Sequence, residues 1–326
     1  MDNKKFGWCF IGSGGIATKV MGDMPYTVNG GYPAVVYSRT YENTCKFAEK
    51  FGAKPCRSIE EAFNDPEVKA VYIATPNTFH KEQSLMAMER GLPVLSEKPL
   101  AVTYEDACEI IKFAKEKQVY FLDGLWTRFN PVICRAIEMV KEGKIGQLRT
   151  LSASFCIYKD FDANARHFNA ALGGGSLLDI GIYPILFACM LFDEEPVEIS
   201  VMADYAPNGV EYLLSITMRY SDGAIARLFS GFSNNEPQDA CISGTGGYIH
   251  IPYLWKAKTA SLHLLNRAEE NEVFEPGFPG FGYQYMFDAA MEDILAGRTE
   301  SSIVPHALSL KVMKVIDLVQ NRLCEK

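Results

Sequence analysis

The feature that most constrains the fold is a glycine-rich turn that follows the first apolar segment. Residues 6–11 form an apolar run, and Gly12, Gly14 and Ala17 follow it with the spacing G-x-G-x-x-A. This spacing is typical of the turn between a buried strand and a helix that binds a dinucleotide. Gly12 allows the tight turn, Gly14 lets the backbone approach a pyrophosphate, and Ala17 permits close packing of the helix on the strand. The helix N-terminus would bind the pyrophosphate. The residues that we assign to this turn are Gly12, Ser13, Gly14, Gly15, Ile16 and Ala17.

Apolar runs alternate with helical patterns up to about residue 123. We expect strands at 6–11, 34–37, 68–74, 93–96 and 119–122, and helices at 41–51, 81–89 and 104–117. Strands that alternate with helices predict a parallel sheet, and right-handed crossovers place helices on both of its faces. Residues 1–123 are therefore expected to form an α/β, doubly wound Rossmann domain that binds a dinucleotide.

The pattern changes after about residue 148. We expect strands at 148–158, 198–204, 211–220, 224–232 and 240–251, separated by turns such as Ser221-Asp222-Gly223. Short strands joined by such turns favour antiparallel pairing. Helices are expected at 176–192, 283–296 and 305–322. Residues 124–326 are therefore predicted to form an α+β domain with a large, mostly antiparallel sheet, used for substrate binding and dimerisation.

Composition excludes several kinds of partner. The 326 residues suggest two domains, and the net charge of −8 argues against a nucleic-acid partner. The nine cysteines are odd in number and contain no C-x-x-C pair, so we expect no disulfide framework, no metal site and a reducing cytoplasm. The apolar stretch from Leu177 to Phe192 contains Asp179 and Pro184 and falls short of a membrane span.

The segment after the second expected strand bears on the choice of cofactor. A site for NAD usually places Asp or Glu there, to accept a hydrogen bond from the ribose 2′-hydroxyl. This chain has Ser38-Arg39-Thr40 instead. The Arg39 guanidinium suits a 2′-phosphate, and the two hydroxyls can support it. The segment therefore favours NADP over NAD, although Arg39 could also be an ordinary solvated arginine.

Three further segments carry a resemblance to a known family. They are Ala74-Thr75-Pro76-Asn77-Thr78-Phe79-His80, Ser96-Glu97-Lys98-Pro99-Leu100, and the run from Gly173-Gly174-Gly175 to Asp179-Ile180-Gly181-Ile182-Tyr183. Together with the glycine turn, the chain resembles the glucose–fructose oxidoreductase / inositol dehydrogenase / rhizopine-catabolism family over nearly its whole length. The resemblance implies cofactor contacts from Thr75, Pro76, Asn77, His80, Glu97 and Lys98. For His80, a structural role remains an equal alternative.

Within that family, residues 125–129 and the Asp-Ile-Gly-Ile-Tyr segment resemble the dimeric dihydrodiol dehydrogenases and the NADP-dependent D-xylose dehydrogenases. This resemblance implies an enzyme that transfers a hydride from a ring hydroxyl of a sugar or trans-dihydrodiol to NADP. One alternative is another sugar or polyol dehydrogenase of the family. A second alternative is a catalytically silent, dinucleotide-binding regulator.

The resemblance also implies the catalytic residues. The family uses the lysine at Lys98, whose bond to Pro99 is typically cis, and most members have a histidine where Tyr183 stands. A tyrosine can take the proton if a nearby cation lowers its pKa. We therefore expect Tyr183 to be the general base in oxidation, Lys98 to activate it, and Asp179, at i−4 on the same helix face, to orient Lys98 or the substrate. Which of Lys98 and Tyr183 takes the proton stays open, because strongly coupled groups titrate as a pair. Alternatively, Tyr183 is a packing residue and Lys98 lies on the surface.

Aromatic residues suit a pocket for a cyclic substrate. The expected substrate-binding residues are Trp126, Arg128, Phe129, Phe155 and Arg166. Arg128 could hold a substrate hydroxyl or pair with a carboxylate. The alternation of Leu213, Ser215 and Thr217 with Leu214 and Ile216 leaves some apolar bulk on each sheet face. Because helices would cover only one face, we expect two sheets to pack together in a two-fold homodimer.

Overall fold

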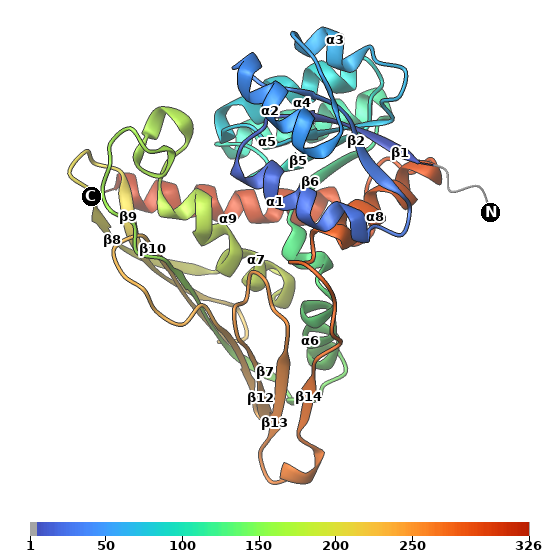
Figure 1. Cartoon of the computed structure of the whole chain (residues 1–326). Coiled ribbons are helices and arrows are strands. Elements are labelled where there is room, and N and C mark those ends of the chain that lie inside the picture. Colours follow the sequence, from blue (N-terminus) through green and yellow to red (C-terminus); the bar gives the residue numbers. More distant parts are fainter. Residues whose placement is uncertain (1–4, 326) are drawn as a thin grey trace. The chain divides into compact units, whose positions relative to one another are not determined.

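The computed structural model describes residues 5–325, and the chain divides into two compact units (Figure 1). Unit 1 comprises residues 1–126 and 279–309, and unit 2 comprises residues 127–278 and 310–326. These bounds differ from the expected domains 1–123 and 124–326, because residues 279–309 return to the first unit. Residues 279–309 join unit 1 because they make hydrogen bonds and aromatic contacts with its N-terminal residues.

Unit 1 contains a six-stranded sheet in which every strand pair is parallel. In sheet order, its strands are β3 (Lys54–Pro55), β2 (Gly31–Tyr37), β1 (Phe6–Ile11), β4 (Ala70–Ile73), β5 (Val94–Glu97) and β6 (Phe121–Gly124). The order reverses between β1 and β4, which is where doubly wound sheets bind ligands. The predicted α/β class is confirmed, and all six residues of β1 are buried, as an apolar run in a covered parallel sheet requires.

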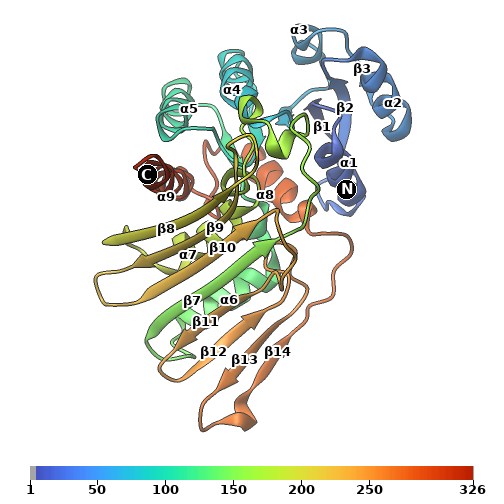
Figure 2. The same cartoon turned by 90° about the vertical axis from the view of Figure 1, so that its left-hand side faces the viewer.

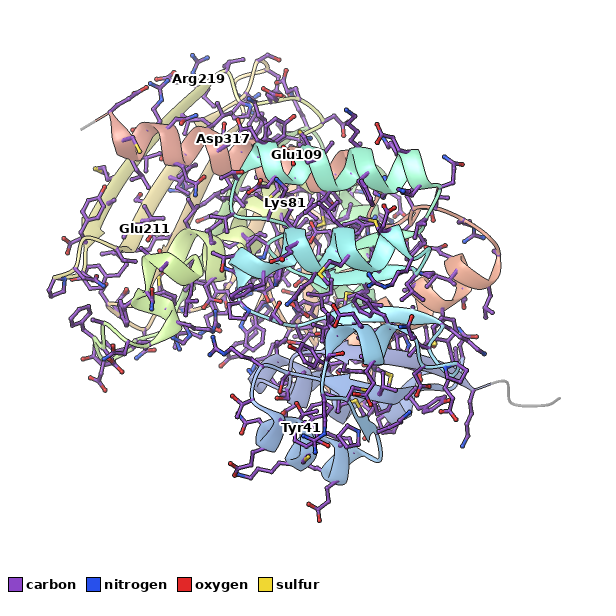
Figure 3. The ribbon with its side chains drawn as sticks, turned by 90° about the horizontal axis from the view of Figure 1, so that it is seen from above. Tyr41, Lys81, Glu109, Glu211, Arg219 and Asp317 are labelled. Carbon is purple, nitrogen blue, oxygen red and sulfur yellow. The ribbon has the colours of Figure 1, made fainter. Side chains whose placement is uncertain are left out.

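Helices cover both faces of this sheet (Figure 2). They are α1 (Gly15–Asp23), α2 (Tyr41–Phe51), α3 (Ile59–Phe63), α4 (His80–Glu89), α5 (Tyr104–Lys117) and α8 (Tyr283–Leu295), with 3₁₀ turns η1 (Met24–Tyr26) and η2 (Asn77–Phe79). The N-cap Thr103 begins α5 by accepting a hydrogen bond from the Asp106 backbone N–H. Lys81 of α4 pairs with Asp106 and Glu109 of α5 at 2.6 and 2.5 Å, which joins these neighbouring helices (Figure 3).

Helix α8 belongs to unit 1 although it lies far away in the sequence. The buried Asp23 carboxylate at the end of α1 accepts hydrogen bonds from the backbone N–H groups of Gly282 and Tyr283, at 2.8 and 2.9 Å. These donors lie at the start of α8, where backbone N–H groups lack partners within the helix. Phe287 of α8 packs edge-on against Trp8 and Tyr72 of the sheet, with centroids 4.9 and 5.1 Å apart. Capping and aromatic burial together hold this segment in place.

Unit 2 contains an eight-stranded sheet that is antiparallel except for the pair β7 and β10 (Figure 2). In sheet order, its strands are β14 (Glu272–Phe274), β13 (Ala260–Leu264), β12 (Gly247–Ile251), β11 (Ala240–Gly244), β7 (Leu148–Cys156), β10 (Ile225–Gly231), β9 (Glu211–Arg219) and β8 (Glu198–Tyr205). The predicted mostly antiparallel sheet is confirmed.

Helical segments precede, interrupt and follow the strands of unit 2 along the chain. They are α6 (Pro131–Lys141), the 3₁₀ turns η4 (Arg166–Phe168), η5 (Ala170–Leu172) and η7 (Ala268–Glu270), the π-helical turn η6 (Leu177–Gly181), α7 (Ile182–Leu191) and most of α9 (His306–Cys324). The turn η3 (Trp126–Phe129) begins in unit 1. On β9, Leu214, Ile216 and Met218 are buried, whereas Thr217 and Arg219 on the other face are exposed. The alternation therefore distinguishes a core face from an open face.

Two expectations about unit 2 are wrong. The single strand expected at 240–251 is a hairpin of β11 and β12, because Gly244, Gly246 and Gly247 allow the chain to turn and pair Ser243 with Tyr248. The helix expected at 176–192 begins with a π-helical turn before it becomes α-helical at Ile182. Such turns are often found at functional sites. Strands β13 and β14 and helices α3 and α6 had not been predicted.

One stretch of unit 2 matches a membrane-spanning segment in length and composition. It is the 22 residues Ala170–Leu191, which overlaps the segment that we expected to fall short of a span. However, 78% of its most apolar window is buried inside the protein. This degree of burial is typical of a core helix, and α7 packs against β7 and β10 of the sheet.

Candidate active site

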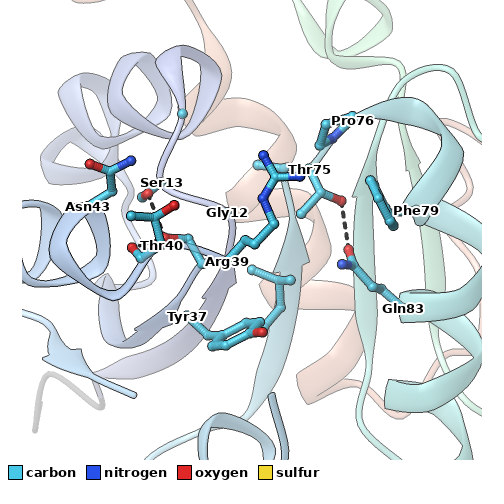
Figure 4. A pocket seen from close by; sticks show the side chains of 14 residues that line it. Gly12, Ser13, Tyr37, Arg39, Thr40, Asn43, Thr75, Pro76, Phe79 and Gln83 are labelled. Atoms are coloured by element: carbon cyan, nitrogen blue, oxygen red, sulfur yellow. Dashed lines mark hydrogen bonds between the residues drawn. The ribbon is translucent and has the colours of Figure 1, made fainter. Parts of the chain in front are cut away.

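A cavity of 420 Å³ lies in unit 1 at the carboxyl ends of β1, β2 and β4 (Figure 4). Its lining includes eight of the residues predicted to bind the cofactor, namely Gly12, Ser13, Gly14, Ser38, Arg39, Thr40, Thr75 and Pro76. Six further lining residues had not been predicted: Ile11, Tyr37, Asn43, Ala74, Phe79 and Gln83. The cavity occupies the position where the strand order reverses, which is where the fold binds ligands.

The glycine turn is tight at Gly12 and open at Gly14. Gly12 has φ of +108°, and a Cβ atom there would lie 2.5 Å from the carbonyl oxygen of Ala74. At Gly14, by contrast, a Cβ atom would meet no protein atom within 4 Å. Gly14 precedes α1, whose first turn has no acidic residue and whose N-terminus has no side-chain cap. The open space and the uncapped N–H groups fit the phosphates of a dinucleotide.

A network of hydroxyl groups forms the wall beside the end of β2. Ser13 donates to the Ser38 hydroxyl at 3.0 Å, and the Ser38 and Thr44 hydroxyls are 2.8 Å apart. Arg39 is exposed and projects into the cavity in the view of Figure 4. None of the fourteen described residues that line this cavity carries a carboxylate. The wall therefore offers a guanidinium and hydroxyl groups to the cofactor.

On the opposite wall, the Thr75 hydroxyl donates to Gln83 Oε1 at 2.6 Å (Figure 4). The buried His80 ring lies between two backbone carbonyls, with Nδ1 at 2.8 Å from the Pro99 oxygen and Nε2 at 3.0 Å from the Thr75 oxygen. Burial lowers the pKa of His80. His80 therefore joins the turn after β4 to the turn after β5, which is the structural role that the sequence left open.

The turn after β5 carries Lys98. The Lys98–Pro99 bond is cis, as the resemblance implied, and Lys98 is half-buried. Its neighbour Glu97 is buried and accepts a hydrogen bond from the Tyr72 hydroxyl at 2.7 Å. Lys98 and Glu97 do not line the cavity described above, and neither do Gly15, Ile16, Ala17, Asn77 and His80. Ala17 is fully buried, which agrees with its expected role in helix–strand packing.

A second buried carboxyl group lies beside Glu97. Asp123 of β6 is 2% exposed, and it pairs with Ser96 in the parallel register of β5 and β6. The pKa of Asp123 is raised to about 8, chiefly by burial; a hydrogen bond with Ser309 and the charge of Lys98 oppose the shift, and the charge of Glu97 adds to it. Asp123 is therefore largely protonated at neutral pH. The sequence motifs gave no indication of this residue.

In unit 2, Asp179 is held by two side chains from η4. Arg166 Nη2 donates to Asp179 Oδ1 at 3.0 Å, and His167 Nε2 lies 3.7 Å from Asp179 Oδ2. The Asp179 side chain is 12% exposed and that of Arg166 is 52% exposed. The predicted substrate-binding residue Arg166 therefore contacts a predicted catalytic residue directly. His167 had not been singled out in the sequence.

Tyr183 belongs to an aromatic cluster in unit 2. It is 8% exposed, and its ring centroid lies 5.4 Å from that of Phe155. Phe155 in turn stacks on Trp255 at 5.4 Å with an interplanar angle of 12°. The Trp255 indole N–H donates to Gln238 Oε1 at 2.7 Å, which fixes the orientation of the ring. Trp255 lies in a loop 72 residues beyond Tyr183, so no local sequence pattern indicated it.

The remaining predicted substrate residues lie around η3. Trp126 is fully buried and stacks on Tyr283 with centroids 4.1 Å apart. Phe129 is 5% exposed, and Arg128 Nη1 lies 3.4 Å from Cys134 Sγ. Whether these three residues contact a substrate stays a prediction. Across residues 5–325, no group of three or more His, Cys, Asp or Glu side chains is arranged to hold a metal ion.

Comparisons with known proteins place these two units in one family. Residues 6–124 match the description "Oxidoreductase family, NAD-binding Rossmann fold", and residues 133–250 match "GFO/IDH/MocA C-terminal domain". The chain is 31% identical to trans-1,2-dihydrobenzene-1,2-diol dehydrogenase of Mus musculus over 323 residues, which cover 95% of this chain and 94% of the relative. The chain belongs to the GFO/IDH/MocA oxidoreductase family. The family resemblance expected from the motifs is thereby confirmed.

Solved structures of similar proteins agree with this family. The aldose-aldose oxidoreductase of Caulobacter crescentus, complexed with glycerol, has a TM-score of 0.88 and 26% identity, and the match covers 99% of this chain and 98% of that one. Levoglucosan dehydrogenase in complex with NADH and levoglucosan has a TM-score of 0.87 at 20% identity, with coverage of 99% and 98%. The second likeness shows the fold alone. As a family member, the chain is an oxidoreductase with a fold that binds a nicotinamide cofactor.

Proposed function

We propose that this oxidoreductase is an NADP-dependent dehydrogenase that oxidises a ring hydroxyl of a sugar or of a trans-dihydrodiol. The observation that carries the proposal is the cavity with the glycine turn on one side and Arg39 on the other. Support for the substrate class comes from the relatives, which are named as diol dehydrogenases and as an aldose-aldose oxidoreductase.

The preference for NADP rests on charge. A 2′-phosphate at the end of β2 would meet the exposed Arg39 guanidinium and the hydroxyls of Ser38 and Thr40. A carboxylate there would repel the phosphate, and the described lining of the cavity has none. Charge-assisted hydrogen bonds from arginine to phosphate are among the stronger polar contacts in proteins. NAD has no such phosphate and would leave Arg39 without this contact.

The proposed proton transfer uses this chain's own side chains. A nicotinamide cofactor held by the glycine turn and Arg39 would supply the acceptor for the hydride released from the carbon that bears the substrate hydroxyl. Tyr183, as the phenolate, takes the proton from that hydroxyl, and the Lys98 ammonium stabilises the phenolate by its positive charge. Asp179 is paired with Arg166, and we assign to it the orientation of Lys98 or of a second substrate hydroxyl. In the reduction direction, Tyr183 returns the proton.

The aromatic cluster of Phe155, Tyr183 and Trp255 supports a cyclic substrate. An aromatic face packs well against the apolar face of a sugar ring or a cyclohexadiene diol, and polar groups at its edge hold the hydroxyls. The Tyr183 hydroxyl would be such a group. We expect the ring to contact Phe155 or Trp255 while its hydroxyl meets Tyr183.

We propose further that the protein is a homodimer and works in a reducing cytoplasm. The open face of the unit 2 sheet presents small polar residues such as Ser152 and Ser215 between larger side chains such as Met202 and Tyr248. Met202 is 67% exposed and Tyr248 is 42% exposed, so a second sheet would cover them. All nine cysteines are free, which suits a reducing compartment.

The experiment that tests the function is a rate measurement. Purified protein is mixed with NADP or NAD and with a panel of aldoses, cyclic polyols and trans-dihydrodiols, and the absorbance of the reduced cofactor is followed. We expect turnover with at least one member of the panel and a higher kcat/KM with NADP. Tight cofactor binding without turnover on any member would instead support the silent regulator that the sequence left open.

A further inference from the structure

A carboxyl group from the sheet of unit 2 contacts the start of the segment that carries Asp179 and Tyr183. Glu211 is the first residue of β9, and its Oε1 accepts a hydrogen bond from the Leu177 backbone N–H at 2.7 Å. Leu177 is the first residue of η6. At this position the backbone N–H has no partner within the helix. Glu211 is 34 residues away in the sequence, so this contact acts as a cap supplied by another element.

The Gly173-Gly174-Gly175 segment accommodates this carboxyl group. Gly175 has φ of +121°, and a Cβ atom added there would overlap both carboxyl oxygens of Glu211. Gly174 is also enclosed, since a Cβ atom would lie 2.8 Å from the Asn169 oxygen. The sequence indicated that these glycines serve a backbone purpose. At Gly175 the positive φ calls for glycine, and the missing side chain also leaves room for the Glu211 carboxyl.

Placing the Glu211 carboxyl group against the start of η6 costs free energy, because this position is poorly solvated. Burial raises the pKa of Glu211 to about 8, and the Leu177 N–H opposes that shift. Glu211 is half-buried, and ionisation of a carboxyl group in a poorly solvated position is costly. A leucine on β9 would avoid this cost but would leave the Leu177 N–H without this acceptor. The carboxyl group therefore serves the start of η6 rather than the stability of the sheet.

We propose that Glu211 is a positioning residue for the proton transfer, and that it acts by anchoring the π-helical turn that carries Asp179 and continues into the helix of Tyr183. This inference rests on the proposed function. Asp179 is the third residue of η6, and Tyr183 lies one turn beyond it, in α7. Loss of the anchor at Leu177 would let the first turn shift, and both functional side chains would shift with it. Misplacement of catalytic groups by about 1 Å can cost roughly 10²-fold in rate.

The test compares three variants of the whole enzyme. Glu211→Ala removes the acceptor and should lower kcat by roughly 10- to 100-fold. The KM for the substrate and the Kd for NADPH, read from cofactor fluorescence, should change little. Glu211→Gln keeps the shape and a carbonyl acceptor, so it should retain most of the activity. The matched control is Glu198→Ala, which removes an exposed carboxylate from β8 and should leave kcat unchanged.

A second readout does not depend on turnover. Hydrogen–deuterium exchange of the peptide that contains residues 176–183 should be faster in Glu211→Ala than in the wild type and unchanged in Glu211→Gln. Should Glu211→Ala fail to fold, Glu211→Asp withdraws the carboxyl by one methylene and should show a smaller effect of the same sign. Unchanged exchange and unchanged kcat in a folded Glu211→Ala would overturn the inference. If exchange is faster in Glu211→Ala than in the wild type but the wild type turns over no substrate, the role of Glu211 as an anchor stands and only the proposed function is rejected.

Discussion

Arg166 Nη2 donates a hydrogen bond to Asp179 Oδ1 at 3.0 Å, which links a predicted substrate-binding residue to a predicted catalytic one. The Asp179 side chain is nearly buried, so removal of the arginine would cost it a charge-assisted hydrogen bond in a poorly solvated position. We therefore expect Arg166→Ala and Asp179→Asn to be non-additive. Each should lower kcat/KM by roughly 10-fold or more, and the double variant should be little worse than the poorer single one. Steady-state rates on all four proteins measure this coupling, and fully additive losses would mean that the two residues act separately.

Substitution of Arg39 tests whether the protein prefers NADP over NAD. Arg39→Ala removes charge-assisted hydrogen bonds to a 2′-phosphate, which are worth about 1.5–3 kcal/mol, or roughly one to two decades in affinity. The KM for NADP should rise by that amount, while the KM for NAD should barely change. Equal changes for both cofactors would rule out the assignment of Arg39 to the phosphate. Arg57→Ala serves as the control, because Arg57 packs on the Tyr41 ring at 4.0 Å and is not part of the cavity lining.

The buried Asp123 makes stability depend on pH. Its pKa is raised to about 8 in the folded chain, chiefly by burial, whereas an unfolded aspartate titrates near about 3.9. Between these two values the folded state binds more protons than the unfolded state, so the free energy of unfolding falls as pH rises. Asp123→Asn removes this titration. Thermal unfolding should show the Tm of the wild type falling more steeply than that of Asp123→Asn from about pH 4 to about pH 8. Parallel pH dependences would mean that Asp123 is ionised throughout.

The proposed dimer can be tested at the open face of the unit 2 sheet. Ser152 lies on β7 in the middle of the sheet and pairs in register with Arg227 and Cys241. Ser152→Arg adds bulk and charge there and should convert a dimer into a monomer at micromolar concentration in sedimentation experiments. Ser302→Arg is the control, because Ser302 is an exposed residue of unit 1. A wild-type protein that sediments as a monomer would contradict the proposal.

The sequence predicted unit 1 well because its signals are local. Gly12 must adopt a positive φ, and each buried strand of a parallel sheet is a short apolar run, so turn and strands can be identified without tertiary contacts. The cavity lining followed from the same logic, since Arg39 and Thr75 come directly after strands. Helix α6 could also have been predicted, because Asn130 caps it and Pro131 stands at its first position.

Other features depend on contacts that no local pattern encodes. The return of residues 279–309 to unit 1 relies on Asp23, about 260 residues away, which caps α8. Trp255 and Glu211 reach Phe155 and Leu177 only because the strands of unit 2 bring distant segments together. The π-helical turn had no separate signal, because the spacing of Asp179 and Tyr183 also suits an α-helix. These features therefore depend on tertiary contacts and could not be predicted from local sequence.

The central claim is that Tyr183 performs proton transfer in an NADP-dependent dehydrogenase, and the turnover of Tyr183→Phe tests it most directly. The substitution keeps the ring that packs on Phe155 and removes only the hydroxyl, so folding and the Kd for NADPH should be unchanged. We expect kcat for oxidation to fall by roughly 10²–10⁴ in Tyr183→Phe and by a similar factor in Lys98→Met, and the double variant to be little worse than either. Near-normal turnover by Tyr183→Phe would show that Tyr183 is a packing residue and does not transfer the proton.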